Sequence, residues 1–205
     1  VSGKPLVVHV HATEFDRSGE NINKQVYDLE KRGMEAADRV IAVSNLTRNI
    51  VINNYHIDPS KVFTVHNAVD FSTVENREIT KGVPEKIVTF LGRITFQKGP
   101  EYFIEAAYKV LQKIKDVRFV RRVAKLGISS HFHFTGFLRG EDVKNMFAYS
   151  DVYVMPSVSE PFGISPLEAM KANVPTIISK QSGVAEVLDH AIKVDFWDVN
   201  ALADA

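Results

Sequence analysis

Short apolar runs alternate along this chain with longer segments in which apolar residues recur every three or four positions. The runs are typical of buried strands, and the longer segments predict amphipathic helices. We predict strands at residues 5–11, 39–43, 62–65, 86–91, 117–120, 131–135, 151–155, 176–179 and 192–195. We predict helices at residues 21–37, 46–55, 100–114, 121–126, 141–149, 166–172, 184–188 and from 200 onward. This alternation predicts an α/β fold with Rossmann-like parallel sheets and helices on both faces.

A polar segment with a Gly82-Val83-Pro84 breaker interrupts the alternation at residues 71–85 and predicts a linker. We therefore expect a first unit at residues 1–70 and a second unit at residues 86–205. The chain begins at Val1 within a strand pattern and ends at Ala205 within a helical one. We expect a fragment, with an incomplete first unit and a second unit truncated at its end.

Composition excludes several classes of function. The 205 residues carry 25 basic and 25 acidic side chains, a balance that gives no footprint for nucleic acid. The sequence has no cysteine, so disulfides and thiolate chemistry are excluded and a cytoplasmic location is favoured. No apolar run approaches the ~20 residues of a transmembrane helix. Peripheral contact with a membrane is left open.

Polar segments follow several predicted strands. Parallel sheets bind ligands at the carboxyl ends of their strands, so these segments are the first candidates for a site. They are residues 11–14, 44, 66–67, 92–93, 136–138 and 156–163.

Residues 92–100 contain two cations between a predicted strand and a predicted helix. Gly92 lets the backbone turn closely, and Gly99 and Pro100 suit the cap and the first position of the helix. Arg93 and Lys98 at a helix N-terminus predict an anion site, because the helix dipole and free N–H groups add to their charge. The alternative is a pair of solvated cations on a surface loop. The spacing differs from the phosphate loop of nucleoside triphosphatases.

Residues 160–170 place Glu160 on a loop and Glu168 in the first turn of the next helix. Ser165 can cap that helix before Pro166, and Ser165-x-x-Glu168 also fits a capping box, in which Glu168 serves only its own helix. The alternative for Glu160 is a plain exposed carboxylate. The backbone at residues 162–163 is predicted to be accessible to a ligand.

Histidines occur in two alternating pairs. His9 and His11 share one strand face, but a third metal ligand is missing, so we expect no metal site. We expect His9 to pack in the core and His11, nearer the strand end, to reach a ligand. We interpret His131 and His133 as structural.

Two segments together resemble the donor site of retaining glycosyltransferases of family 4, the glycosyl transferases group 1. They are Glu160-Pro-Phe-Gly-x4-Glu168-Ala-Met and Gly92-Arg93-x4-Lys98-Gly99. The strand ends Ala42-Val-Ser44 and Val65-His-Asn67-Ala-Val-Asp70 are also similar to motifs of that family. Residues 11–16 resemble the glycogen and starch synthases within it. The resemblance implies a GT-B fold, in which two Rossmann-like domains face each other across a cleft.

The resemblance also implies roles for single residues. Arg93 and Lys98 would bind the diphosphate of a nucleotide sugar, Glu160 the hydroxyls of the transferred sugar, and Glu168 the ribose hydroxyls. His11 would touch the sugar near its reacting carbon. The remaining donor contacts would be the backbone of Gly92, Phe162, Gly163 and Ile164, with Leu138 at the nucleobase.

The implied activity is retaining, metal-independent transfer of a hexose from a UDP-, GDP- or ADP-sugar to a glycan or lipid-linked acceptor, without a cofactor. We expect this fragment alone to be inactive. A nucleotide-sugar-binding module without catalysis and a GT-B-fold epimerase are the alternatives. Two features depart from the family. Arg121-Arg122 stands where a glycine-rich turn is usual, and the family's N-terminal Gly-Gly loop and terminal crossing helix have no counterpart here.

Overall fold

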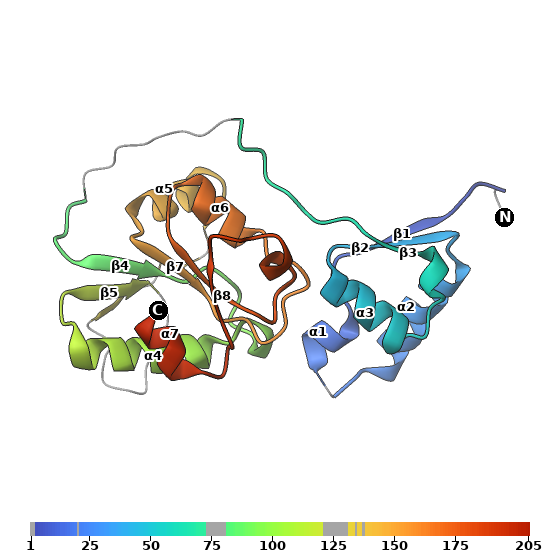
Figure 1. The fold of residues 1–205 in the computed structure, drawn as a ribbon, viewed down its shortest axis with the longest axis horizontal. Coiled ribbons are helices and arrows are strands. Elements are labelled where there is room, and N and C mark those ends of the chain that lie inside the picture. The colour runs from blue at the N-terminus through green and yellow to red at the C-terminus, as the bar shows by residue number, and fades with distance from the viewer. Residues whose placement is uncertain (1–2, 20, 73–80, 121–130, 134, 137) are drawn as a thin grey trace.

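The computed structural model describes residues 3–19, 21–72, 81–120, 131–133, 135–136 and 138–205. The described residues form two parallel sheets, each with its own helices (Figure 1). We call the residues up to 72 the first unit and those from 81 the second unit. The predicted boundaries at residues 70, 71 and 85 stay predictions, since most of the linker lies outside the described residues.

The first unit contains a three-stranded sheet in the order β1-β2-β3. Its strands are β1 (Val7–Val10), β2 (Arg39–Ala42) and β3 (Val62–Thr64). Its helices are α1 (Glu14–Ser18), α2 (Lys24–Ala36) and α3 (Asn45–Asn53), and a 3-10 turn, η1, spans Pro59–Lys61. The helices lie on one side of the sheet (Figure 1), where Met34, Val51 and Tyr55 build a core with the strands.

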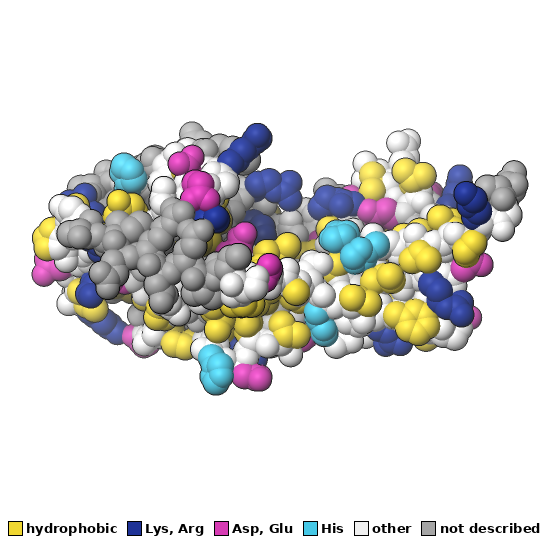
Figure 2. All heavy atoms as spheres, turned by 90° about the horizontal axis from the view of Figure 1, so that it is seen from above, with side chains coloured by type: hydrophobic (Ala, Val, Ile, Leu, Met, Phe, Trp, Pro, Cys, Tyr) yellow, Lys and Arg dark blue, Asp and Glu magenta, His cyan; other side chains and the backbone are white. Residues whose placement is uncertain are grey.

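The other side of this sheet carries exposed apolar side chains, including Val7 and Phe63. Figure 2 shows apolar side chains gathered over this unit, and acidic and basic ones interspersed on the same face of the molecule. His9 lies on this open side and is exposed. The prediction that His9 packs in the core is therefore wrong, because alternation along β1 turns Val8 and Val10 toward the helices and His9 away from them.

The second unit contains a six-stranded sheet in the order β6-β5-β4-β7-β8-β9. The strands are β4 (Lys86–Thr89), β5 (Val117–Val120), β6 (Phe132–His133), β7 (Val152–Met155), β8 (Thr176–Ser179) and β9 (Ile192–Val194). Helices α4 (Pro100–Lys113) and α7 (Val199–Asp204) cover one face, and α5 (Glu141–Tyr149) and α6 (Ser165–Lys171) cover the other (Figure 1).

Two apolar clusters fill the space between this sheet and its helices. Phe103, Ala106 and Leu202 belong to the cluster beneath α4 and α7. Phe147 and Leu167 belong to the cluster beneath α5 and α6. Burial on both faces explains why β7, at the centre of this sheet, is a continuous apolar run in the sequence.

Among the described residues, the structure confirms the predicted α/β alternation and differs from it in two elements. Helix α1 was not predicted. The helix predicted at residues 184–188 is a 3-10 turn, η4, at Gly183–Glu186. The helix predicted at residues 121–126 lies outside the described residues, as does residue 134 of the strand predicted at 131–135.

Candidate active site

The strand order reverses between β4 and β7, which are neighbours although β5 and β6 stand between them in sequence. In an open parallel sheet, such a switch point leaves a crevice at the carboxyl ends of the two strands. Both motifs singled out in the sequence follow these two strands. We call residues 90–99 the Lys98 loop and residues 156–164 the Glu160 loop.

Backbone contacts hold the two loops against each other. The Val158 N–H donates to the Gln97 carbonyl at 2.9 Å. Gly99 has φ 58° and ψ 46° and precedes Pro100 at the start of α4, as predicted. A side chain at Gly99 would place its Cβ 2.1 Å from the Pro156 carbonyl oxygen. Only glycine allows both this left-handed conformation and this close approach.

Glu160 and Lys98 meet where these loops cross. Lys98 Nζ forms an ion pair with Glu160 Oε2, and the Ser157 hydroxyl donates to the same oxygen at 3.3 Å. Glu160 is only 7% exposed, so the alternative of a plain exposed carboxylate is wrong. The pair places one cation and one carboxylate side by side at this crossing.

The backbone of Glu160 is fixed independently of its side chain. Its N–H donates to the Gln181 carbonyl at 3.1 Å, and its carbonyl accepts from the Gly183 N–H at 2.9 Å. These bonds form an isolated parallel bridge between Glu160 and Ser182, so the Glu160 loop is tied to the segment after β8. A polar residue that must point into a site gains precision from such support.

Arg93 lies on the Lys98 loop and is exposed. Its carbonyl accepts from the Thr95 N–H at 3.1 Å, which tightens the turn. Gly92 is exposed beside it, and a Cβ at Gly92 would lie 3.5 Å from Lys98 Cδ. The two predicted cations thus belong to one loop.

Residues 162–164 turn the chain from the Glu160 loop into α6. The Phe162 side chain is buried in the apolar cluster under α6, and its carbonyl accepts from the Val184 N–H at 2.7 Å. Gly163 has φ 93°, and its position leaves room for Glu160, whose Cγ would lie 3.1 Å from an added Cβ. Ile164 is exposed and precedes the first residue of the helix.

Glu168 lies in the first turn of α6, as predicted, but the predicted cap is wrong. The residue before the helix is Ile164, and no side chain caps it. Ser165 is helical and shares a hydrogen bond of 2.7 Å with the Tyr153 hydroxyl, which occupies the group that a capping box would use. Desolvation raises the pKa of the Glu168 carboxyl above its ordinary value.

His11 and Leu138 are the remaining predicted site residues. His11 is exposed at the end of β1, with its ring centroid 4.1 Å from that of His9. Desolvation, and then the neighbouring His11, lowers the pKa of His9. Leu138 is half-buried and packs on the cluster that contains Phe162. Among the described residues, no group of three or more His, Asp or Glu side chains could hold a metal ion.

The first unit reaches the Glu160 loop through residues that the sequence analysis missed. Asp16 of α1 accepts from the Ser159 hydroxyl at 2.8 Å, and the Thr47 hydroxyl of α3 donates to the Pro161 carbonyl at 3.3 Å. The spacing Thr13-x-x-Asp16 could have identified Asp16, because it is the spacing of a helix capping pair. No sequence signal identified Thr47.

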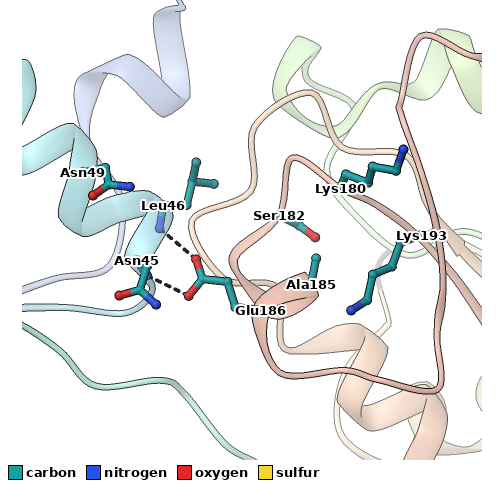
Figure 3. A pocket seen from close by; sticks show the side chains of 8 residues that line it. All are labelled: Asn45, Leu46, Asn49, Lys180, Ser182, Ala185, Glu186 and Lys193. Carbon is teal, nitrogen blue, oxygen red and sulfur yellow. Dashed lines mark hydrogen bonds between the residues drawn. The ribbon is translucent and has the colours of Figure 1, made fainter.

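Glu186 makes a further contact between the units. Its carboxylate accepts from the N–H groups of Asn45 and Leu46, both at 2.8 Å, at the start of α3 (Figure 3). His66, at the end of β3, bonds to the same carboxylate at 2.8 Å. Burial opposes ionisation of Glu186, but these three hydrogen bonds outweigh it and lower the pKa of its carboxyl.

A pocket of about 460 Å³ lies beside this contact. It is lined by Asn45, Leu46, Asn49, Lys180, Ser182, Ala185, Glu186 and Lys193 (Figure 3). None of the predicted site residues lines it, so it is separate from the Lys98–Glu160 pair.

Comparisons with known proteins show the family of this chain. Residues 72–205 match the family Glycosyl transferases group 1, and residues 1–73 match Glycosyltransferase Family 4. The chain belongs to the glycosyl transferases group 1, as its motifs indicated.

Curated relatives extend beyond this chain. It is 30% identical to an uncharacterized glycosyltransferase of Methanocaldococcus jannaschii over 92% of its own length and 55% of that protein. It is also 30% identical to an Escherichia coli UDP-Gal:alpha-D-GlcNAc-diphosphoundecaprenol alpha-1,3-galactosyltransferase, over 89% of its own length and 54% of that protein. The chain thus spans about half the length of the curated relatives it matches.

Solved structures confirm the fold class. The HepE protein of Anabaena in complex with UDP-glucose matches 98% of this chain with a TM-score of 0.81 and 20% identity, and the chain covers 61% of it. A sucrose-phosphate synthase of Thermosynechococcus elongatus matches 97% of this chain with a TM-score of 0.76 and 21% identity, and the chain covers 57% of it. The fold is therefore of the GT-B type. None of the helices in the described part of the chain is long and apolar enough to cross a bilayer.

Proposed function

We propose that the protein transfers a hexose from a nucleoside diphosphate sugar to a glycan or lipid-linked acceptor, with retention of configuration and without a metal ion. The observation that carries this proposal is the Lys98–Glu160 pair at the switch point of the second sheet. Arg93 lies on the same loop as Lys98. Glu168 follows the Glu160 loop, in the first turn of α6.

The chemical groups of a nucleotide sugar match these two cations and two carboxylates. Its diphosphate is an anion that suits Arg93 and Lys98, and its two sugars carry hydroxyls that carboxylates can accept from. In this proposal, phosphate oxygens take over hydrogen bonds of Lys98, and the Glu160 carboxylate turns to the hydroxyls of the transferred hexose. Glu168 holds the ribose hydroxyls, and the N-terminus of α6 between the two carboxylates faces the phosphates.

The transfer step breaks the bond between the anomeric carbon and the diphosphate oxygen. Negative charge then grows on the leaving diphosphate, and Arg93 and Lys98 stabilise that charge more than they stabilise the bound substrate. The acceptor oxygen bonds to the anomeric carbon on the same face, and its proton passes to the departing phosphate. His11 faces the sugar from the first unit. The transfer step as described requires no cofactor.

The family match, the curated galactosyltransferase relative and the UDP-glucose complex of the Anabaena protein support a nucleotide sugar as donor. A cytoplasmic location, where such donors are made, stays a prediction.

The test is a screen of UDP-, GDP- and ADP-sugars against the full-length protein, with an oligosaccharide or lipid-linked acceptor. We expect an α-linked product from an α-linked donor by NMR, in the presence of EDTA. An inverted product would contradict retention, and a complete loss of activity in EDTA would contradict metal independence.

A further inference from the structure

Two hydrogen bonds connect the first unit to the Glu160 loop, one on each side of Glu160. The Ser159 hydroxyl donates to Asp16 Oδ1 at 2.8 Å, and the Thr47 hydroxyl donates to the Pro161 carbonyl at 3.3 Å. Ser159 and Pro161 are the immediate neighbours of Glu160 in the chain. A displacement of the first unit would therefore act on the loop on both sides of this carboxylate.

Asp16 is held rigidly for this contact. Its other oxygen, Oδ2, accepts from the Thr13 N–H at 2.7 Å and from the Thr13 hydroxyl at 2.8 Å, which leaves Oδ1 for Ser159. Asp16 is 3% exposed, and a buried polar group is costly unless it is hydrogen-bonded, as Asp16 is here by three bonds. Helix α1 is itself anchored, because Glu14 accepts from the Asn23 N–H at 3.0 Å.

Thr47 lies in a second rigid contact. It is fully buried, and its hydroxyl accepts from Ser44 Oγ at 3.1 Å and donates to the Pro161 carbonyl. The two units touch closely here. A Cβ at Gly183 would lie 2.4 Å from Ser44 Cβ and 2.2 Å from the Pro161 carbonyl oxygen.

The same approach reaches the Lys98 loop. Helix α1 packs against η2 (Phe96–Lys98), the 3-10 turn that ends at Lys98. The first unit thus contacts both loops of the Lys98–Glu160 pair. Neither of the two hydrogen bonds to the Glu160 loop uses a side chain that was assigned to the donor.

We propose that Asp16 and Thr47 are positioning residues, which set the Glu160 carboxylate in place for the transferred sugar when the two units are docked. The inference rests on the proposed function of this site as a donor site. Docking and sugar recognition are then coupled, and by linkage a bound sugar nucleotide favours docking by the same factor by which docking favours its binding.

The test compares two double variants of the full-length protein. Ser159→Ala with Thr47→Val removes both hydrogen bonds between the first unit and the Glu160 loop. Thr89→Val with Ser150→Ala is the matched control, because it removes the buried bond of 2.6 Å between these two hydroxyls within the second unit. The readout is the ratio of the affinities for UDP-glucose and UDP, or for the GDP or ADP pair that the wild type binds.

We expect that ratio to fall by about 25-fold in the first variant, since each of the two lost hydrogen bonds is worth roughly a factor of five. The control should keep the wild-type ratio although its thermal stability falls. A merely structural role would move stability and leave the ratio unchanged. Equal ratios in the two variants would overturn the inference.

A distance measurement tests docking separately. This chain has no cysteine, so Gln25→Cys on α2 and Lys109→Cys on α4, both exposed, can carry spin labels. We expect the sugar nucleotide to narrow the distance distribution in the wild type and in the control, but much less in the Ser159 and Thr47 variant. The same narrowing in all three would overturn the coupling. If no sugar nucleotide binds the wild type, the proposed function fails, and this inference fails with it.

Discussion

Lys98 and Glu160 form an ion pair although they stand 62 positions apart in the sequence. Their side chains are 18% and 10% exposed, so both groups are largely removed from water and face each other directly. Removing one partner of such a pair leaves an uncompensated charge behind. A phosphate and a sugar hydroxyl that replace these contacts would satisfy both groups.

Replacing Lys98 by alanine should weaken the binding of a nucleoside diphosphate by ~1.5–3 kcal/mol, the usual range for hydrogen bonds to charged groups. Isothermal calorimetry on the full-length protein measures this change. Lys109→Ala is the control, because Lys109 is exposed on α4 and away from the Lys98 loop. Unchanged affinity in Lys98→Ala would remove the phosphate role from this residue.

Replacing Glu168 by alanine should reduce discrimination between UDP and 2′-deoxy-UDP, or between the corresponding pair of the preferred base. A hydrogen bond from a ribose hydroxyl to a carboxylate is worth about 1.5–3 kcal/mol. We expect the wild type to prefer the ribonucleotide and the variant to bind both about equally. The same preference in both proteins would show that Glu168 does not hold the ribose.

Acid should weaken the contact that Glu186 makes with the first unit. Its pKa is lower in the folded protein than its ordinary value of 4.5, so the unfolded chain takes up this proton first. The stabilisation is therefore complete above that ordinary value and is lost as the pH falls through the folded pKa. Glu186→Gln removes the charge and one acceptor site.

Chemical unfolding of the wild type and of Glu186→Gln, at a series of pH values, checks this sign. We expect the wild type to be more stable at pH 7 and the difference to shrink below pH 4.5, the ordinary value. A difference that is constant over this range would mean that the carboxylate charge contributes nothing to the contact.

Replacing Gly99 by alanine should destabilise the protein by more than about 2 kcal/mol, since it combines an unfavourable φ with a clash. The added Cβ would lie 2.1 Å from the Pro156 carbonyl oxygen. Gly136→Ala is the control, because Gly136 has φ 72° but nothing within 4 Å of an added Cβ. Thermal unfolding should show a larger loss for Gly99→Ala, and equal losses would contradict the close packing of the two loops.

The fold of the second unit could be predicted from its apolar periodicity, because helices cover both faces of its sheet and its central strands β7 and β8 are largely buried. The run that ends at Met155 and the proline at residue 166 were sufficient to place β7, α6 and the loop between them. Helix α1 escaped prediction because it has five residues and is mostly polar, so it shows no apolar period. The exposure of one side of β1, on which His9 lies, could not be predicted, because apolar residues in a strand predict burial.

The meeting of Lys98 with Glu160 was only partly predictable. Strand order is a property of the sheet, and the pairing of β4 with β7 brings together two loops that the sequence places far apart. The Asp16–Ser159 bond spans 143 positions and joins two units, so no local pattern reports it. Ser165 was wrongly predicted to cap α6. The Tyr153 hydroxyl, to which its side chain bonds instead, lies in another element and could not be identified from the local sequence.

The central claim is that Glu160 serves the transfer of a sugar from a nucleotide donor. The most direct measurement is the rate at which the full-length protein releases nucleoside diphosphate from UDP-, GDP- and ADP-sugars, in the wild type and in Glu160→Ala. Loss of one group that acts in the transition state typically lowers kcat by about 10²–10³-fold. We predict release from at least one donor by the wild type, and a loss of at least about 100-fold in a variant that keeps its fold by circular dichroism. Equal rates in the two proteins would contradict the account.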